Sequence, residues 1–141
     1  MDRIRTLLQV IRERGVVRSL AFTVSYLFDL CIEARYGTDT VSWVRIKDLD
    51  IESDHKERAV DYQPTQRLPL MRLLRTLDIP RDRVFLDLGS GKGTVLLIAA
   101  DFGFVTLRGV EFSPELCRVA GENCAKYKKR TGRGSRFRII E

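Results

Sequence analysis

The apolar positions in the first half of the chain recur at helical spacing. Positions 4, 7, 8 and 11 form one amphipathic stripe that ends at Gly15, and the polar side of this stripe carries four arginines. A second helix is expected at 16–34 and a third, short helix at 69–77. Between them we expect a turn at 36–40 and one short strand around Trp43.

The second half alternates short apolar runs with helical segments. The run at 84–88 is of the kind found in a parallel strand covered on both faces, and a glycine-rich turn leads from it into a helix at 95–100. The next strand is expected at 106–111. Ser113 is a candidate N-cap for a helix that runs to about residue 128, and a third strand begins at 136. This order predicts an α/β fold with a parallel sheet.

Composition limits the class of protein. The chain has 141 residues, which is one domain at most, and its 44% hydrophobic content is enough for a core. The formal net charge of +6 permits an anionic partner but does not require one. Cys31, Cys117 and Cys124 lack metal-site spacing, so we expect reduced thiols in a cytoplasmic protein and assign no metal.

Neither amino-terminal helix is expected to cross a membrane. Arg18, Asp29 and Glu33 leave the apolar part of the second helix too short for a span. A charged helix precedes it and no small-residue cleavage site is evident, which argues against a signal peptide. We expect the basic first helix to dock on the domain, and a helix lying on a membrane surface is the alternative.

The glycine-rich turn is the strongest candidate site. Gly89, Gly91 and Gly93 alternate with other residues, directly after a strand that has Asp87 near its carboxyl end. Glycine permits positive φ and close approach of a ligand to the backbone, and the following helix offers unpaired N–H groups. Position 94 is threonine, which excludes the dinucleotide fingerprint, and positions 86 and 93 do not fit a P-loop. The alternative is a tight turn that binds nothing.

A second acidic residue comes at a suitable distance. Glu111 ends the next expected strand, 24 residues after Asp87. In open α/β sheets, ligands bind beyond the carboxyl ends of the strands, and an acid at about this distance bonds the hydroxyls of a ribose. We therefore predict that Glu111 holds a ribose. A solvated strand end is the alternative.

The pattern acidic-x-Gly-x-Gly-x-Gly resembles motif I of the class I S-adenosylmethionine-dependent methyltransferases. Tyr62-Gln63-Pro64-Thr65, followed by a helix and then D-x-G-S-G-x-G, is similar to a group that includes protein-lysine methyltransferases. The resemblance implies S-adenosylmethionine as cofactor and a protein side chain as the favoured acceptor. It makes Tyr62 and Thr65 candidate contacts to the methionine end, with a packed tyrosine and a helix-start threonine as the alternative.

The same resemblance gives roles to the turn. The three glycines and Ser90 would let the backbone approach the amino-acid end of the cofactor, and Asp87 would organise the turn or the ammonium group. Lys92 is expected to point to solvent. No catalytic residue is named, because the family places its acceptor-lining motif after a fourth strand.

The fold class expected is a Rossmann-like methyltransferase fold that is incomplete, with its first two to three parallel strands. Residues 1–60 would form a helical extension, and 61–141 the amino-terminal half of a cofactor-binding domain. The first strand would have an unpaired edge, a template for pairing with another chain. The chain is then expected to be truncated, to complete its sheet as a homodimer, or to cover that edge with its amino-terminal helices.

Two other functions stay open. One is a protein that binds S-adenosylmethionine without transferring a methyl group. The other is a basic interaction module, because residues 126–138 hold seven basic residues and no acid, a pattern that permits nucleic-acid binding. A solvated helix end and turn explains that stretch equally well.

Overall fold

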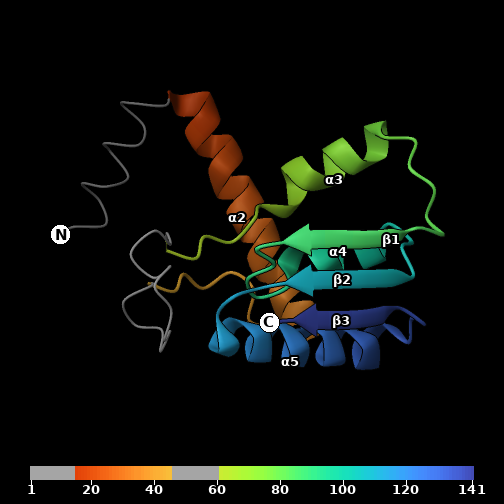
Figure 1. The fold of residues 1–141 in the computed structure, drawn as a ribbon. Helices are drawn as coiled ribbons and strands as arrows, with labels where there is room; N and C mark the ends of the chain where they lie inside the picture. Colours follow the sequence, from red (N-terminus) through yellow and green to blue (C-terminus); the bar gives the residue numbers. More distant parts are fainter. Residues whose placement is uncertain (1–14, 46–60) are drawn as a thin grey trace.

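The structure is a computed structural model, and it describes residues 15–45 and 61–141. Seven elements follow one another, shown in Figure 1: α2 (Val16–Tyr36), α3 (Arg67–Thr76), β1 (Val84–Leu88), α4 (Thr94–Asp101), β2 (Thr106–Val110), α5 (Pro114–Thr131) and β3 (Arg136–Ile140). The expected helix at positions 4–11 and most of the region after Trp43 lie outside the described residues.

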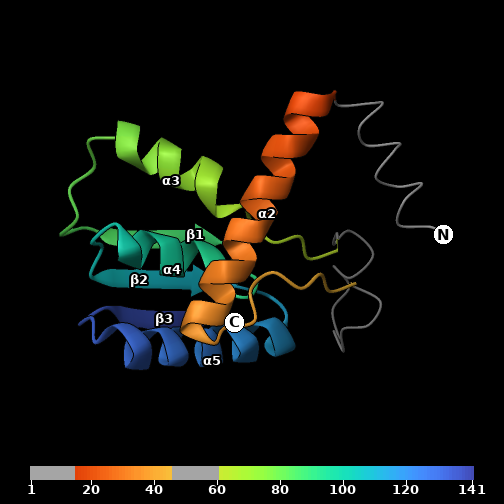
Figure 2. The same cartoon turned by 180° about the vertical axis from the view of Figure 1, so that it is seen from behind.

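The three strands form a parallel sheet in the order β1-β2-β3. Helix α4 joins β1 to β2, and α5 joins β2 to β3, so each crossover is a helix, as parallel strands require. Figures 1 and 2 show α4 behind the sheet, α5 along its β3 side, and α2 crossing behind both. This is a partial Rossmann-like α/β fold preceded by helices, as the alternation of patterns predicted.

The core lies between the sheet and its helices. Its buried members come from α4, α5, β2 and the loop before β2: Leu96, Leu97, Ala99, Ala100, Phe104, Leu107, Cys124 and Tyr127. Phe85 adds an edge-on contact to Phe104, with ring centroids 5.0 Å apart. Cys124 therefore packs in the core, as its place on the inward face of α5 predicted.

The other face of the sheet is open among the described residues. Val84, Leu86 and Leu88 of β1 are 50%, 54% and 74% exposed, and Arg108 beside Leu86 is exposed as well. The prediction that this strand is covered on both faces is therefore wrong for the described part of the chain. A run of five apolar residues fits a strand, but it does not show what packs on each side. The β1 edge has no partner strand among the described residues, and a homodimer through it stays a prediction.

Helix ends agree with local sequence signals. Helix α2 ends where Gly37 adopts a left-handed φ of 69° and donates its N–H to the Glu33 carbonyl. Ser113 caps α5 by accepting a hydrogen bond from the Leu116 N–H at 3.3 Å, which confirms the predicted start. The strand expected around Trp43 is wrong for the described residues, where this segment forms a single antiparallel bridge, between Val44 and Tyr62.

Candidate functional site

The glycine turn joins β1 to α4 with the geometry that its sequence predicts. Gly89, Gly91 and Gly93 have φ values of 76°, 50° and 83°, in a region of backbone conformation that residues with a Cβ rarely adopt. The N–H groups of Gly89 and Ser90 donate to the Val110 carbonyl at 2.8 and 2.9 Å. The turn is therefore bonded to the carboxyl end of β2, where α/β proteins place their ligands.

Asp87 points its carboxylate into this region without a complete set of partners. Its Oδ2 is buried and accepts no hydrogen bond. Burial, and then the nearby charge of Glu111, raise the pKa of Asp87 to about 6. The Ser90 hydroxyl is also buried without a hydrogen-bond partner. Two unsatisfied polar groups at one turn are a costly arrangement that a donor-bearing ligand would relieve.

Glu111 is tied to the backbone around it. It is only 4% exposed; its Oε2 accepts the Gly91 N–H at 2.8 Å and its Oε1 accepts the Ser113 N–H at 3.0 Å. The carboxylate thus joins the end of β2 to the glycine turn and to the start of α5. A solvated strand end, the alternative reading, is wrong. The ribose contact stays a prediction.

Tyr62 lies directly on the turn. A Cβ built on Gly91 would collide with the Tyr62 ring, so this glycine gives the ring its space. The Tyr62 hydroxyl donates to the Thr40 carbonyl at 3.2 Å and lies 3.4 Å from the Thr94 hydroxyl. Burial raises the pKa of Tyr62 to about 12, against the opposing effect of the Thr94 hydrogen bond. Thr65 is exposed, and no described contact joins it to the turn.

Lys92 is buried, and the expectation that it points to solvent is wrong. The residue is 2% exposed, and its Nζ lies 3.0 Å from both carboxylate oxygens of Asp39. It also donates to the Ser42 hydroxyl and lies 5.7 Å from the centre of the Tyr62 ring. The reason is a long-range contact: the residues after α2 fold over the glycine turn and supply the anion that a buried lysine needs.

We name residues 37–42 the Asp39 loop. Asn123 of α5 fixes this loop to the turn: its Nδ2 donates to the carbonyls of Asp39 and Lys92 at 2.8 and 2.9 Å, and its Oδ1 accepts the Asp39 N–H at 2.8 Å. At the other end, the Glu33 carboxylate accepts the N–H groups of Thr40 and Val41. The loop is therefore bonded to the turn, to α5 and to α2.

Sequence reasoning missed Asp39, Lys92 and Asn123. One signal could have found Asn123, because an amide between Ala120 and Cys124 on the inward face of α5 must find buried hydrogen bonds. The sequence alone does not pair Asp39 with Lys92, since 53 residues separate them. Of the predicted residues, the structure brings together Asp87, the turn, Glu111 and Tyr62, and it leaves Thr65 apart.

These features define a class: part of a Rossmann-like α/β domain, with a glycine turn and two acids at the carboxyl ends of its first strands. Residues 59–135 match the family model described as histone methylation protein DOT1, and the chain belongs to this family.

Two curated relatives match parts of the chain. It is 36% identical over 52 residues to EEF1A lysine methyltransferase 2 of Homo sapiens, and this match covers 37% of the chain and 22% of the relative. It is 45% identical over 62 residues to ribosomal protein L11 methyltransferase of Geobacter sulfurreducens, and this match covers 44% of the chain and 20% of the relative. The chain thus spans about a fifth of the length of each relative. No solved structure matches it.

A helix that could cross a membrane is not found in the part of the chain that the structure describes. None of its helices combines the length and the apolar character that crossing a bilayer demands.

Proposed function

We propose that this chain binds S-adenosylmethionine at the glycine turn and forms the cofactor-binding part of a protein methyltransferase. The observation that carries the proposal is the buried, unpartnered Oδ2 of Asp87 beside a turn of three left-handed glycines. An ammonium group, such as that of the methionine part of the cofactor, would satisfy this carboxylate and offset the charge of Glu111. The donor set therefore fits the cofactor.

The other residues of the site have supporting roles in this proposal. Gly89 has open space where a Cβ would stand and leaves room for a ligand at the backbone, whereas Gly91 and Gly93 give their space to Tyr62 and Ala120. The Ser90 hydroxyl is buried against Gly109, so a contact with the cofactor rests on the resemblance alone. Glu111 would bond the ribose while it holds the turn, since a carboxylate accepts more hydrogen bonds than the two that it receives here. Tyr62 forms a wall of the site.

Thr65 and the residues before position 61 complete the proposed site. The contact of Thr65 with the methionine end rests on the resemblance alone. The division of the chain at residue 60 needs a refinement, because the Asp39 loop belongs to the wall of the cofactor site through Lys92 and Asn123. We propose that the cofactor-binding unit includes residues 37–45 as well as 61–141.

The proposed acceptor is a protein side chain. The family is described by histone methylation, and both relatives are named for the methylation of a protein. The cofactor supplies an activated methyl group on a sulfonium, and the residues of this chain contribute binding and exclusion of water. No general base is assigned among the described residues.

Calorimetric titration tests the cofactor site. S-adenosylhomocysteine is expected to bind the wild-type chain and NAD is not. Asp87→Asn removes a charge-assisted contact, so binding should weaken about 10- to 100-fold. Asp82→Asn is the matched control, because Asp82 is an exposed carboxylate whose ion pair, with Arg83, is exposed as well. Equal affinity of Asp87→Asn and wild type, or equal binding of NAD, would remove the proposal.

Labelled methyl transfer tests the acceptor. The chain is incubated with methyl-labelled S-adenosylmethionine and a mixture of proteins, and label in the protein fraction is measured. Transfer that Asp87→Asn reduces supports a protein acceptor. Cofactor binding without transfer supports the non-catalytic alternative for this chain.

A further inference from the structure

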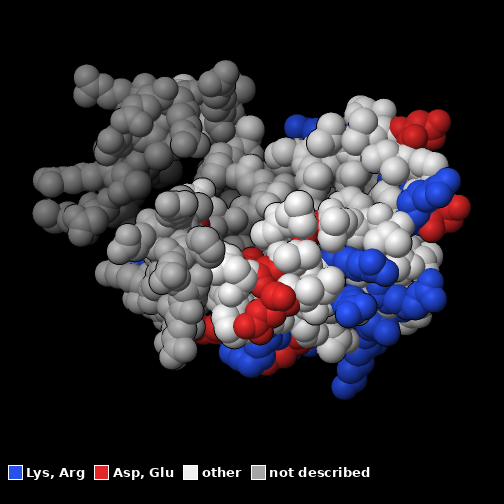
Figure 3. Space-filling model, in the orientation of Figure 1, with Lys and Arg blue, Asp and Glu red and all other residues white. Residues whose placement is uncertain are grey.

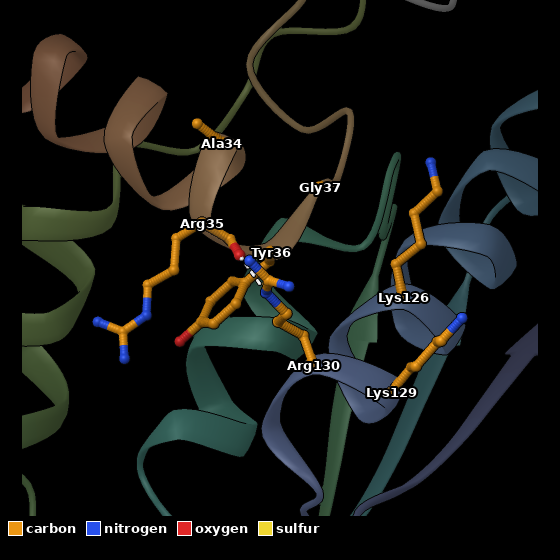
Figure 4. Close-up of a pocket in the computed structure, with 7 residues that line it drawn as sticks. All are labelled: Ala34, Arg35, Tyr36, Gly37, Lys126, Lys129 and Arg130. Carbon is orange, nitrogen blue, oxygen red and sulfur yellow. Dashed lines mark hydrogen bonds between the residues drawn. The ribbon is translucent and has the colours of Figure 1, made fainter.

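A hollow with a volume of about 420 Å³ lies where the end of α2 meets the outer side of α5 (Figure 4). Four of its lining residues are basic: Arg35, Lys126, Lys129 and Arg130. None of its lining residues is acidic, and it shares no residue with the glycine turn. It is a separate concavity with one sign of charge.

Local structure explains how these cations gather. Lys126, Lys129 and Arg130 are spaced so that they share one side of α5. Helix α2 stops at Tyr36 because Gly37 turns left-handed, and this leaves the Arg35 carbonyl exposed at the helix end. Arg130 donates its Nε–H to that carbonyl at 3.0 Å, which joins the two walls (Figure 4).

Among residues 15–45 and 61–141, no ion pair neutralises the charge of the hollow, since none involves any of its four basic residues. Two acids lie near the hollow without pairing with these four residues: Lys126 helps to lower the pKa of Asp39, and Asp101 accepts a hydrogen bond from the Tyr36 hydroxyl. Concave sites lined by one sign of charge concentrate ions of the opposite sign. The hollow is therefore suited to an oxyanion.

Basic residues continue from the hollow around the β3 edge of the sheet. Residues 126–138 hold seven basic residues and no acid, and they lead to Arg136 and Arg138 on the open face of the sheet. Arg138 is in register with Arg108 of β2, and Figure 3 shows lysine and arginine side chains gathered over this end of β2 and β3. A polymer with regularly repeated anions fits such a surface better than one isolated carboxylate does.

We propose that the hollow holds a backbone phosphate of a nucleic acid, and that the arginines on the open face of the sheet hold phosphates farther along the same nucleic-acid chain. Base stacking contributes little here, because Tyr36, the aromatic residue of the hollow, is half-buried and packs edge-on against Tyr127. Binding through phosphates alone is independent of sequence and strongly dependent on salt.

Fluorescence anisotropy with a labelled 20-nucleotide oligo-dT at 50–200 mM NaCl tests this. One phosphate in the hollow and three at Arg108, Arg136 and Arg138 make four neutralised phosphates, which predict a slope of log K against log salt of about −3 for a single strand. Lys126→Gln together with Lys129→Gln removes two of the four cations that hold the phosphate in the hollow, so this contact should be lost and the slope should become shallower by about 0.7. Both side chains are exposed, and circular dichroism checks that the variant is folded.

A matched control separates position from net charge. Arg72→Gln with Arg83→Gln makes the same change in formal net charge, from +6 to +4, at exposed residues outside the hollow. This control should keep the wild-type slope. An equal loss in both variants, or wild-type chain that does not bind at 50 mM NaCl, would overturn the proposal. Polyglutamate that competes as well as unlabelled oligo-dT would overturn it in favour of an acidic protein partner. No cofactor is present, so the result is independent of the methyltransferase proposal.

Discussion

Replacing Lys92 by methionine tests whether the glycine turn holds the Asp39 loop. Methionine keeps most of the apolar length of the lysine side chain and removes the ammonium group. In the structure this group bonds both oxygens of Asp39 and the Ser42 hydroxyl, and the Lys92 side chain is 3% exposed. Removing one partner of a fully buried ion pair costs about 3–5 kcal/mol. The Asp39 side chain is 52% exposed and water can solvate it, so we expect about 1–3 kcal/mol.

Urea unfolding of four proteins measures this contribution: wild type, Lys92→Met, Asp39→Asn and the double variant. Direct contact between the two side chains predicts a coupling free energy of about 1–2 kcal/mol. Arg118→Met is the control, because Arg118 forms an exposed i,i+4 pair with Glu122 and should cost less than about 0.5 kcal/mol. A Lys92→Met variant as stable as the control, or zero coupling, would refute the reasoning.

The same pair predicts the sign of a pH effect. Burial raises the pKa of Asp39, but hydrogen bonds from Ser42 and Lys92, and then the charge of Lys92, outweigh it, so the pKa lies below the ordinary value of 3.8. A carboxyl with a lowered folded-state pKa stabilises the fold above its unfolded-state pKa and loses this effect as pH falls through the folded-state value. The cost of Lys92→Met should therefore be full at pH 7 and shrink below about pH 4.

Three further predictions concern the turn and its acids. Asp87→Asn should stabilise the ligand-free chain at pH 7, because the pKa of Asp87 is raised to about 6. The gain in unfolding free energy, measured with urea, should be about 1–2 kcal/mol after allowance for solvent screening, and it should disappear as pH falls towards 4. No gain at pH 7 would contradict the stated cause of the raised pKa, which is burial and the charge of Glu111. Gly91→Val should destabilise the chain by more than about 2 kcal/mol and abolish binding of S-adenosylhomocysteine, because the valine Cβ would collide with Tyr62. Gly121→Ala is the control and should have neither effect, since Gly121 lies in open space on α5. A near-wild-type melting temperature of Gly91→Val would be inconsistent with this packing. Glu111→Ala should remove most cofactor affinity and also lower the melting temperature, because two backbone N–H groups lose their acceptor; an unchanged melting temperature would argue against these bonds.

The sequence predicted those parts of the fold that local patterns determine. Strand 84–88, the turn of three glycines and the cap at Ser113 all appear where they were expected, since each depends on residues close together in the chain. The open face of β1 could not be predicted in this way. Whether Leu86 is covered depends on which element packs against the strand, and no local pattern records that.

The candidate site was predicted to a similar extent. Asp87 and Glu111 were each predicted at the carboxyl end of a parallel strand, and the structure places them close enough for the charge of Glu111 to raise the pKa of Asp87. The bonds from Glu111 to the turn and from Lys92 to Asp39 could not be predicted, because they join segments distant in sequence. Local reasoning placed Lys92 wrongly, because it expected a side chain in solvent and the structure buries it.

Thermal unfolding with and without S-adenosylhomocysteine tests the central claim most directly. The claim is that the glycine turn and its acids bind this cofactor, so ligand at about 100 times Kd should add about 2.7 kcal/mol and raise the melting temperature by several degrees. NAD at the same concentration should give no shift, and Asp87→Asn should lose most of the shift with S-adenosylhomocysteine. A folded sample that shows no shift with S-adenosylhomocysteine, or an equal shift with NAD, would contradict the account.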